Sequence, residues 1–170
     1  MKKVIFLDFD GSLNTEKYQA ELLAEKKRSF DQYGPIFDPE AVCNLRRIIE
    51  SVPDAAIVIS SSWKLEGLQR MRDMWRYRNL PGSVYDITPD YMSPEWNVDL
   101  ELTDDYSILV GRGNEVRHWL KENAPDGSRY VIFDDLPDFL PEQQGHLITL
   151  NPYVGLSAED ADLAIRMLHD

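Results

Sequence analysis

Four short, predominantly apolar runs constrain the fold of this chain more than any other feature. They lie at residues 4–7, 54–60, 130–133 and 146–150. Runs of this length are typical of strands buried on both faces, which occur mostly in parallel sheets covered by helices. Helical apolar spacing follows or separates the runs, at residues 39–51, 65–79, 113–123 and 157–169. The alternation predicts a doubly wound α/β domain, with further short strands at residues 84–88 and 107–110.

Composition limits the classes of function. The 170 residues suffice for one domain with a proper core, which we place at 1–170 with small insertions at about 15–38 and 63–110. The net charge of −12 argues against broad non-specific binding to nucleic acid. Asp8 and Asp10 interrupt the first apolar run, so it is neither a signal sequence nor a membrane span. The lone Cys43 cannot form an internal disulfide, which fits a cytoplasmic protein.

Polar residues follow three of the predicted strands where each strand ends. The first strand is followed by Asp8, Asp10 and Gly11, the second by Ser60 and Ser61, and the third by Asp134 and Asp135, with Asp138 close behind. The carboxyl ends of parallel strands meet at one edge of the sheet, and ligands bind there in open α/β folds. We therefore expect these side chains to converge on one site.

The convergent carboxylates indicate a metal site. Asp8 and Asp10 point to the same side if the strand continues, and two such carboxylates repel each other unless a cation or a proton relieves them. Oxygen ligands of this kind suit Mg²⁺. Gly11 would let the chain turn sharply at this point. The alternative is that all of these residues are polar strand ends facing water, an explanation that weakens as the number of aligned strand ends grows.

Four segments carry a resemblance to a known family. VIFLDFDGSLN resembles the first motif of the haloacid dehalogenase (HAD) superfamily, IVISSSW the second, and YVIFDDLPD the fourth, while Arg112 stands where the third motif usually has Lys or Arg. Together with RGNEVRHWL, they are similar to the small HAD-like domains associated with RNA-repair polypeptides and their stand-alone bacterial or phage relatives. The resemblance implies a Rossmann-like core.

The resemblance also implies a reaction. Asp8 would attack a phosphate monoester, and Asp10 would act as general acid and then as general base. Mg²⁺ would be held by Asp8, the Asp10 carbonyl and Asp135, with Asp134 or Asp138 acting directly or through water. A serine would donate a hydrogen bond to the phosphoryl group, and a cation would offset its charge.

Two of these assignments stay open. Ser61 takes the role of Ser60 if the strand ends one residue later. Arg112 competes with Lys64 for the role of third-motif cation, and Arg112 is favoured because its helix directly precedes the fourth-motif strand. Gly11, Ser61 and Lys64 are the candidate substrate-binding residues.

The lengths of the insertions indicate what size of substrate the site could accept. Residues 15–38 are too few for a large folded cap, so the resemblance implies a minimal-cap enzyme with an open site, suited to a bulky phosphorylated substrate such as a nucleic-acid end. Basic residues at 26–28 and along 64–78 could border this site, or they could form solvated helix faces paired with Glu66 and Asp73. The alternative to an enzyme is a non-catalytic module that binds a phosphorylated ligand or a partner. The sequence does not predict an oligomeric state.

Overall fold

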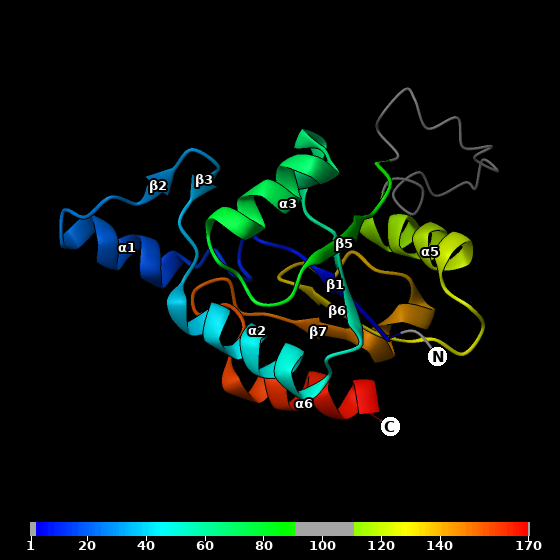
Figure 1. The fold of residues 1–170 in the computed structure, drawn as a ribbon. Coiled ribbons are helices and arrows are strands. Elements are labelled where there is room, and N and C mark those ends of the chain that lie inside the picture. Colours follow the sequence, from blue (N-terminus) through cyan, green and yellow to red (C-terminus); the bar gives the residue numbers. More distant parts are fainter. Residues whose placement is uncertain (1–2, 91–110, 170) are drawn as a thin grey trace.

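A parallel five-stranded sheet forms the centre of the molecule. The structure is a computed structural model, and it describes residues 3–90 and 111–169 (Figure 1). The strands follow the order β5 (Val84–Ile87), β4 (Ala55–Ile59), β1 (Lys3–Leu7), β6 (Arg129–Asp134) and β7 (Leu147–Thr149). Every neighbouring pair in this sheet is parallel. The predicted α/β class is confirmed, and the carboxyl ends of all five strands lie along one edge.

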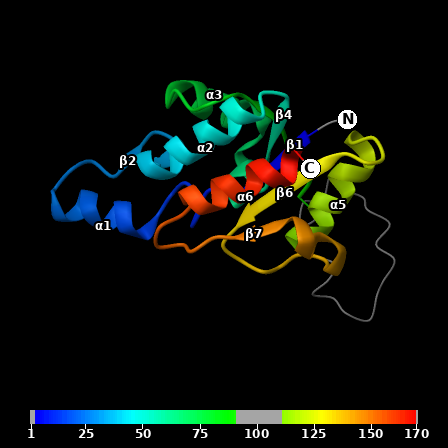
Figure 2. The ribbon, with the colours of Figure 1, turned by 90° about the horizontal axis from the view of Figure 1, so that it is seen from below.

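Strand β1 is the central strand, and its side chains alternate between two cores. Ile5 and Leu7 face a core built with α2 (Pro39–Ser51), α3 (Leu68–Tyr77) and α6 (Ala158–His169). Val4 and Phe6 face a second core, built with α5 (Arg112–Asn123). Helices α2 and α6 run side by side in both views (Figure 2). Because both faces of β1 are covered, its sequence is apolar at every position from residue 4 to residue 7.

Two of the predicted helices begin with caps that the sequence encodes. The Asp38 carboxylate accepts a hydrogen bond from the Glu40 N–H at 2.9 Å, and proline occupies the start of α2. At α6, the Ser157 Oγ accepts a bond from the Asp160 N–H, and Asp160 accepts one from the Ser157 N–H. This reciprocal arrangement is a capping box with aspartate in the place of Glu or Gln.

The first insertion is a short helix followed by a small hairpin. Helix α1 (Glu16–Ala24) leads to β2 (Phe30–Asp31) and β3 (Gly34–Pro35), which pair antiparallel beyond the edge of the main sheet (Figure 1). None of the three elements is apparent in the sequence, because Leu22 is the one residue of α1 that is buried, and no apolar stripe marks the helix. This insertion therefore consists of one short helix and a two-stranded hairpin.

The second insertion departs from the predicted single helix over 65–79. A 3₁₀ helix, η1 (Ser62–Glu66), comes first, and Gly67 separates it from α3. Gly67 has φ of 90°, which a helix does not allow and which glycine adopts readily. Arg70 pairs with Glu66 and Arg76 pairs with Asp73, as expected for a solvated helix face.

The remaining short elements follow the sequence closely. The strand predicted at 84–88 is β5, and the one at 146–150 is β7, which is preceded by the 3₁₀ helix η2 (Pro141–His146). The strand expected at 107–110 lies outside the described residues.

Candidate active site

Asp8 follows the central strand and lies inside the protein. Its N–H donates to the Phe133 carbonyl at 3.0 Å, which continues the pairing of β1 with β6 by one residue. Only 2% of Asp8 is exposed. On the other side, the Ser60 N–H donates to the Leu7 carbonyl at 2.9 Å. The backbone at Asp8 is therefore held by pairing on both flanks of the strand, which sets the place from which its carboxyl group extends.

Arg112 is the cation that contacts Asp8. Its Nη1 lies 3.1 Å from Asp8 Oδ2 and 2.6 Å from Asp134 Oδ2. Arg112 is the first residue of α5, whose start lies at the carboxyl edge of the sheet. Burial alone would lower the pKa of Arg112, but the charges of Asp8 and Asp134 outweigh this effect and raise it. The guanidinium is therefore a permanent positive charge between two acids that end neighbouring strands.

Both of these acids are strongly desolvated. Burial raises the pKa of Asp8 above its ordinary value, and Arg112, the Phe9 N–H and Ser61 act against that shift. Burial also raises the pKa of Asp134, to about 6, with Arg112 lowering it and the charge of Asp8 raising it further. Desolvated carboxylates that repel one another gain from a nearby cation. One arginine does not remove the cost of keeping both of them ionised.

The acids around Asp8 fit a divalent metal ion. Asp8, Asp134 and Asp135 each offer a carboxylate oxygen, and these atoms lie within 4.8 Å of one another. Asp8 Oδ1 is buried and has no hydrogen-bond partner among the described residues. Gly11 has φ of 75°, and a Cβ at this position would lie 2.7 Å from Asp135 Cγ, so glycine allows the two turns to approach. An all-oxygen donor set with one free buried oxygen suits Mg²⁺.

Magnesium binding to this cluster should raise the melting temperature. At about 100 times its dissociation constant, a ligand of the native state adds about 2.7 kcal/mol to the free energy of unfolding. For a chain of this size that corresponds to roughly 5–10 °C. We expect the shift in the wild type and in an exposed control, Glu50→Gln, and we expect it to vanish in Asp135→Asn. Thermal melts with Mg²⁺ or with a chelator measure it, and equal shifts in all three proteins would place the metal elsewhere.

Asp10 lies at the solvent side of the site, and both of its carboxylate oxygens accept hydrogen bonds. The Asn14 side-chain amide donates to Oδ1 at 2.7 Å, and the Trp63 indole N–H donates to Oδ2 at 3.0 Å. Asn14 belongs to the same turn, as a motif of the form DxDGxLN allows. Trp63 is 53 positions away and comes from η1, so no local sequence pattern indicates its contact with Asp10. The one sequence feature that could have indicated this contact is the position of Trp63 directly after the serines of the second motif.

The two candidate serines are both buried, but in different surroundings. Ser60 Oγ has no hydrogen-bond partner among the residues that the structure describes. Ser61 is close enough to Asp8 to lower the pKa of that carboxyl group. Ser61 also caps η1, where its hydroxyl faces the Trp63 N–H. Both hydroxyls therefore belong to the strand end beside Asp8.

Lys64 points to a different partner. Its ammonium group forms an ion pair with Glu115 of α5, and it donates to Thr88 Oγ1 at 3.0 Å and to the Pro89 carbonyl at 2.9 Å. Only 7% of Lys64 is exposed. Of the two candidate cations, the structure therefore places Arg112 against Asp8, and it engages Lys64 in a buried contact between η1, β5 and α5.

Asp138 lies apart from the acid cluster. Its backbone carbonyl accepts a hydrogen bond from the Gly113 N–H, and its carboxylate lies against Gly111 at the start of α5. The three acids that could share a metal ion among the described residues do not include it.

A parallel sheet with an acid-bearing DxDG turn after its central strand, and an acid pair with one buried member at the end of the neighbouring strand, defines a HAD-type domain. The chain belongs to the family described as the HAD domain in Swiss Army Knife RNA repair proteins, whose profile matches residues 4–161. No curated protein and no solved structure gave a significant match. Within residues 3–90 and 111–169, no helix has both the length and the apolarity to cross a bilayer. Membership of this family supports phosphatase chemistry at the level of the superfamily.

Proposed function

We propose that this protein is a Mg²⁺-dependent phosphomonoester hydrolase in which Asp8 is the nucleophile. The observation that carries the proposal is the setting of Asp8 at the end of the central strand. Arg112 holds one oxygen of its carboxylate, and the other oxygen is buried without a described partner. A carboxylate fixed in this way is prepared to attack an electrophile, and a phosphoryl group satisfies the nearby positive charge.

The chain's own residues supply both halves of the reaction. The Asp8 carboxylate forms a bond to phosphorus while the bond to the ester oxygen breaks, and Asp10 gives that oxygen its proton. The product of this half is an alcohol and an aspartyl-phosphate on Asp8. Asp10, now ionised, takes a proton from a water molecule, which attacks the phosphorus and releases inorganic phosphate and free Asp8. Arg112 neutralises part of the phosphoryl charge throughout.

The metal would be held by Asp8, Asp135 and the Asp10 carbonyl, with Asp134 acting directly or through water. When bound, Mg²⁺ would supply positive charge to the phosphoryl oxygens. Asp134 keeps Arg112 in place, through the bond of 2.6 Å between them. Ser60 and Ser61 supply hydroxyl donors from the adjacent strand end, and Gly11 keeps this side of the cluster open. The buried Lys64 acts indirectly in this proposal, by holding the η1 segment against α5.

A narrower form of the proposal is a polynucleotide 3′-phosphatase. The description of the family as a domain of RNA repair proteins supports it, and so does the short first insertion at residues 15–38, which is too small to enclose a bulky end. The alternative is a module that binds a phosphorylated ligand without hydrolysing it. The intact set of Asp8, Asp10 and Arg112 favours the enzyme, because a binding module has no need of a proton donor beside the nucleophile.

Phosphate release from a substrate panel tests the proposal. The panel contains an aryl phosphate, sugar phosphates, nucleotides, a phosphopeptide and oligonucleotides phosphorylated at the 3′ or the 5′ end. We expect turnover that requires Mg²⁺ and stops with a chelator. Binding of these esters to folded protein without release of phosphate would favour the non-catalytic module. Equal rates for the 3′-phosphorylated oligonucleotide and the aryl phosphate would remove the narrower claim.

Asp10→Asn should lower turnover by an amount that depends on the leaving group. For esters of ordinary alcohols we expect kcat/KM, which reports the half of the reaction in which the ester oxygen leaves, to fall about 10²–10⁴-fold, because an alkoxide leaves poorly without a proton donor. For an aryl phosphate the fall in kcat/KM should be much smaller, because a phenolate leaves unaided. Asp10 is exposed, so the variant should fold normally. Steady-state rates on a matched alkyl and aryl pair measure the difference, with Asp126→Asn as the exposed control. Equal losses on both esters would exclude Asp10 as the acid.

A further inference from the structure

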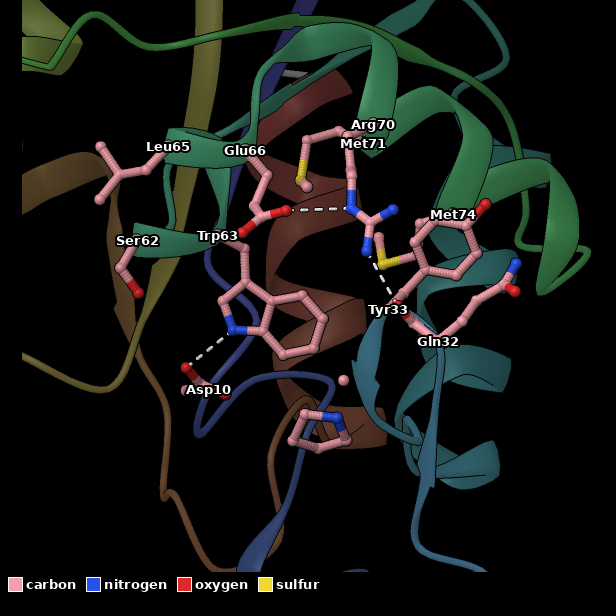
Figure 3. A pocket seen from close by; sticks show the side chains of 12 residues that line it. Asp10, Gln32, Tyr33, Ser62, Trp63, Leu65, Glu66, Arg70, Met71 and Met74 are labelled. Atoms are coloured by element: carbon pink, nitrogen blue, oxygen red, sulfur yellow. Dashed lines mark hydrogen bonds and ion pairs between the residues drawn. The ribbon is translucent and has the colours of Figure 1, made fainter.

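A pocket of about 450 Å³ opens beside Asp10, between the β2–β3 hairpin and the segment formed by η1 and α3 (Figure 3). Its volume lies in the range of small-ligand pockets. The residues that line it come from the first insertion, from the turn after β1 and from the second insertion. They include Asp10, Gln32, Tyr33, Trp63, Arg70 and Met74. Neither insertion alone would form it.

The position of the pocket links it to the leaving group of the proposed reaction. Asp10 lies on the wall of the pocket and would protonate the ester oxygen, so the group attached to that oxygen extends towards this space. The Trp63 N–H holds Asp10 at 3.0 Å, and the rest of the indole lines the pocket (Figure 3). Whatever fills the pocket therefore meets the same tryptophan that orients the proton donor.

The lining is suited to a flat ring. Trp63 and Tyr33 offer aromatic surfaces that are only partly buried, and Figure 3 shows both of them towards the same space. Met71 and Met74 lie behind these rings in the hydrophobic core and close the bottom of the pocket. Around these residues lie the polar side chains of Gln32, Ser62 and Glu66, which can bond to the edge of a heterocycle.

The charges in the pocket disfavour a second phosphate. Arg70 is the one cation among the described lining residues, and it is already engaged. Its Nε lies 3.0 Å from Glu66, its Nη2 donates to the Gln32 carbonyl at 2.9 Å, and its guanidinium lies 4.7 Å from the centre of the Tyr33 ring. With Asp10 and Glu66 also present, the pocket favours an uncharged group over an anionic one.

The walls of the pocket are fixed in advance. The Trp63 ring packs against Phe9, with centroids 5.3 Å apart, and Gly34 allows the hairpin to approach its edge. Arg78 donates to both oxygens of Asp31, at 2.7 and 2.9 Å, and so ties the hairpin to the end of α3. A preformed pocket loses less conformational entropy when its ligand binds.

From these contacts we infer that the pocket takes the nucleobase of a nucleoside leaving group, with the phosphate at Asp8 and the ester oxygen at Asp10. The inference rests on the phosphohydrolase proposed above and names its substrate class. The nucleoside is either a free nucleotide or the terminal residue of an oligonucleotide, since both present the same base and sugar to the pocket.

The test compares two esters of secondary alcohols, adenosine 3′-phosphate and glycerol 2-phosphate, on the wild type and on Tyr33→Ala. We expect kcat/KM to be higher for the adenosine ester, and Tyr33→Ala to reduce this value about tenfold, as for loss of one base-stacking residue. Glycerol 2-phosphate should be hydrolysed equally by both proteins, which also shows that the variant folds. Tyr33→Phe should retain the preference, as should Tyr153→Ala, an exposed tyrosine outside the pocket. The value of kcat/KM for a 3′-phosphorylated oligonucleotide distinguishes the two sources of the nucleoside. A value above that for adenosine 3′-phosphate identifies a nucleic-acid end, and a value below it identifies a free nucleotide.

Binding of adenosine itself, by calorimetry, separates this inference from the proposed function. Adenosine should bind the wild type and bind Tyr33→Ala about tenfold more weakly, whether or not any ester is hydrolysed. If adenosine binds in this way and no ester is turned over, the pocket stands and the phosphohydrolase fails. If esters are turned over with no preference for the nucleoside, or if Tyr33→Ala affects both esters equally, the inference is overturned.

Discussion

Asp8→Asn should abolish phosphate release, with a loss of kcat of about 10⁴-fold or more, as for removal of a nucleophile in other covalent mechanisms. The amide of asparagine has the shape of the carboxylate but cannot attack phosphorus. Burial raises the pKa of Asp8, which means that the ionised carboxylate is destabilised by the loss of its solvation. The uncharged asparagine side chain does not carry this free-energy penalty. The variant should therefore melt no lower than the wild type.

The stability of Asp8→Asn makes the result interpretable. A protein that melts normally and releases no phosphate from any ester of the panel assigns the loss to chemistry. Phosphate release near the wild-type rate would instead show that another group attacks. Asp54→Asn, at an exposed acid that pairs with Lys3, is the matched control and should retain activity.

Lys64→Met should lower the free energy of unfolding by about 3–5 kcal/mol, the range for breaking a buried ion pair by removing one partner. Lys64 and Glu115 have 7% and 8% of their side chains exposed. Burial lowers the pKa of Lys64, and Glu115 acts against that shift, so the ammonium group depends on this partner. Methionine has a similar volume but removes the ammonium group that lies against the Glu115 carboxylate. Denaturant unfolding measures the change.

A double variant separates the pair from the packing around it. Lys64→Met with Glu115→Leu removes both charges, and we expect it to be considerably more stable than Lys64→Met alone. Lys17→Met, at an exposed pair with Glu40, should have little effect. If the double variant is as unstable as the single one, the loss comes from the bonds of Lys64 to Thr88 and the Pro89 carbonyl rather than from the buried charge.

The sequence predicts the parts of the molecule that local patterns encode. The strands around Asp8 are apolar at consecutive positions because both faces of the sheet are covered, and α2 has an apolar stripe because one side of it packs on that sheet. Parallel strands place Asp8, Ser60 and Asp134 at one edge, so the meeting of these residues follows from topology alone. The α/β class was predictable for this reason, and the family was predictable from the motifs that these strand ends carry.

Contacts between distant side chains were not predictable. Trp63 meets Asp10, Lys64 meets Glu115 and Arg78 meets Asp31 across intervals of 53, 51 and 47 residues. Each contact depends on how a loop turns after it leaves the sheet, and no periodic pattern records that. Gly67 illustrates the same limit, because a single positive φ divides a segment whose apolar spacing suits one continuous helix.

The central position of β1 and the small size of the β2–β3 hairpin have a consequence for how this protein can change. Amides of β1, paired on both sides, should exchange with solvent only when the whole domain opens, whereas the two-residue strands of the hairpin should open at lower free energy. Damage to the hairpin can therefore leave Asp8 in place. Under selection or in the laboratory, the hairpin can be rebuilt to fit another ligand while the chemistry proposed for Asp8 is inherited unchanged.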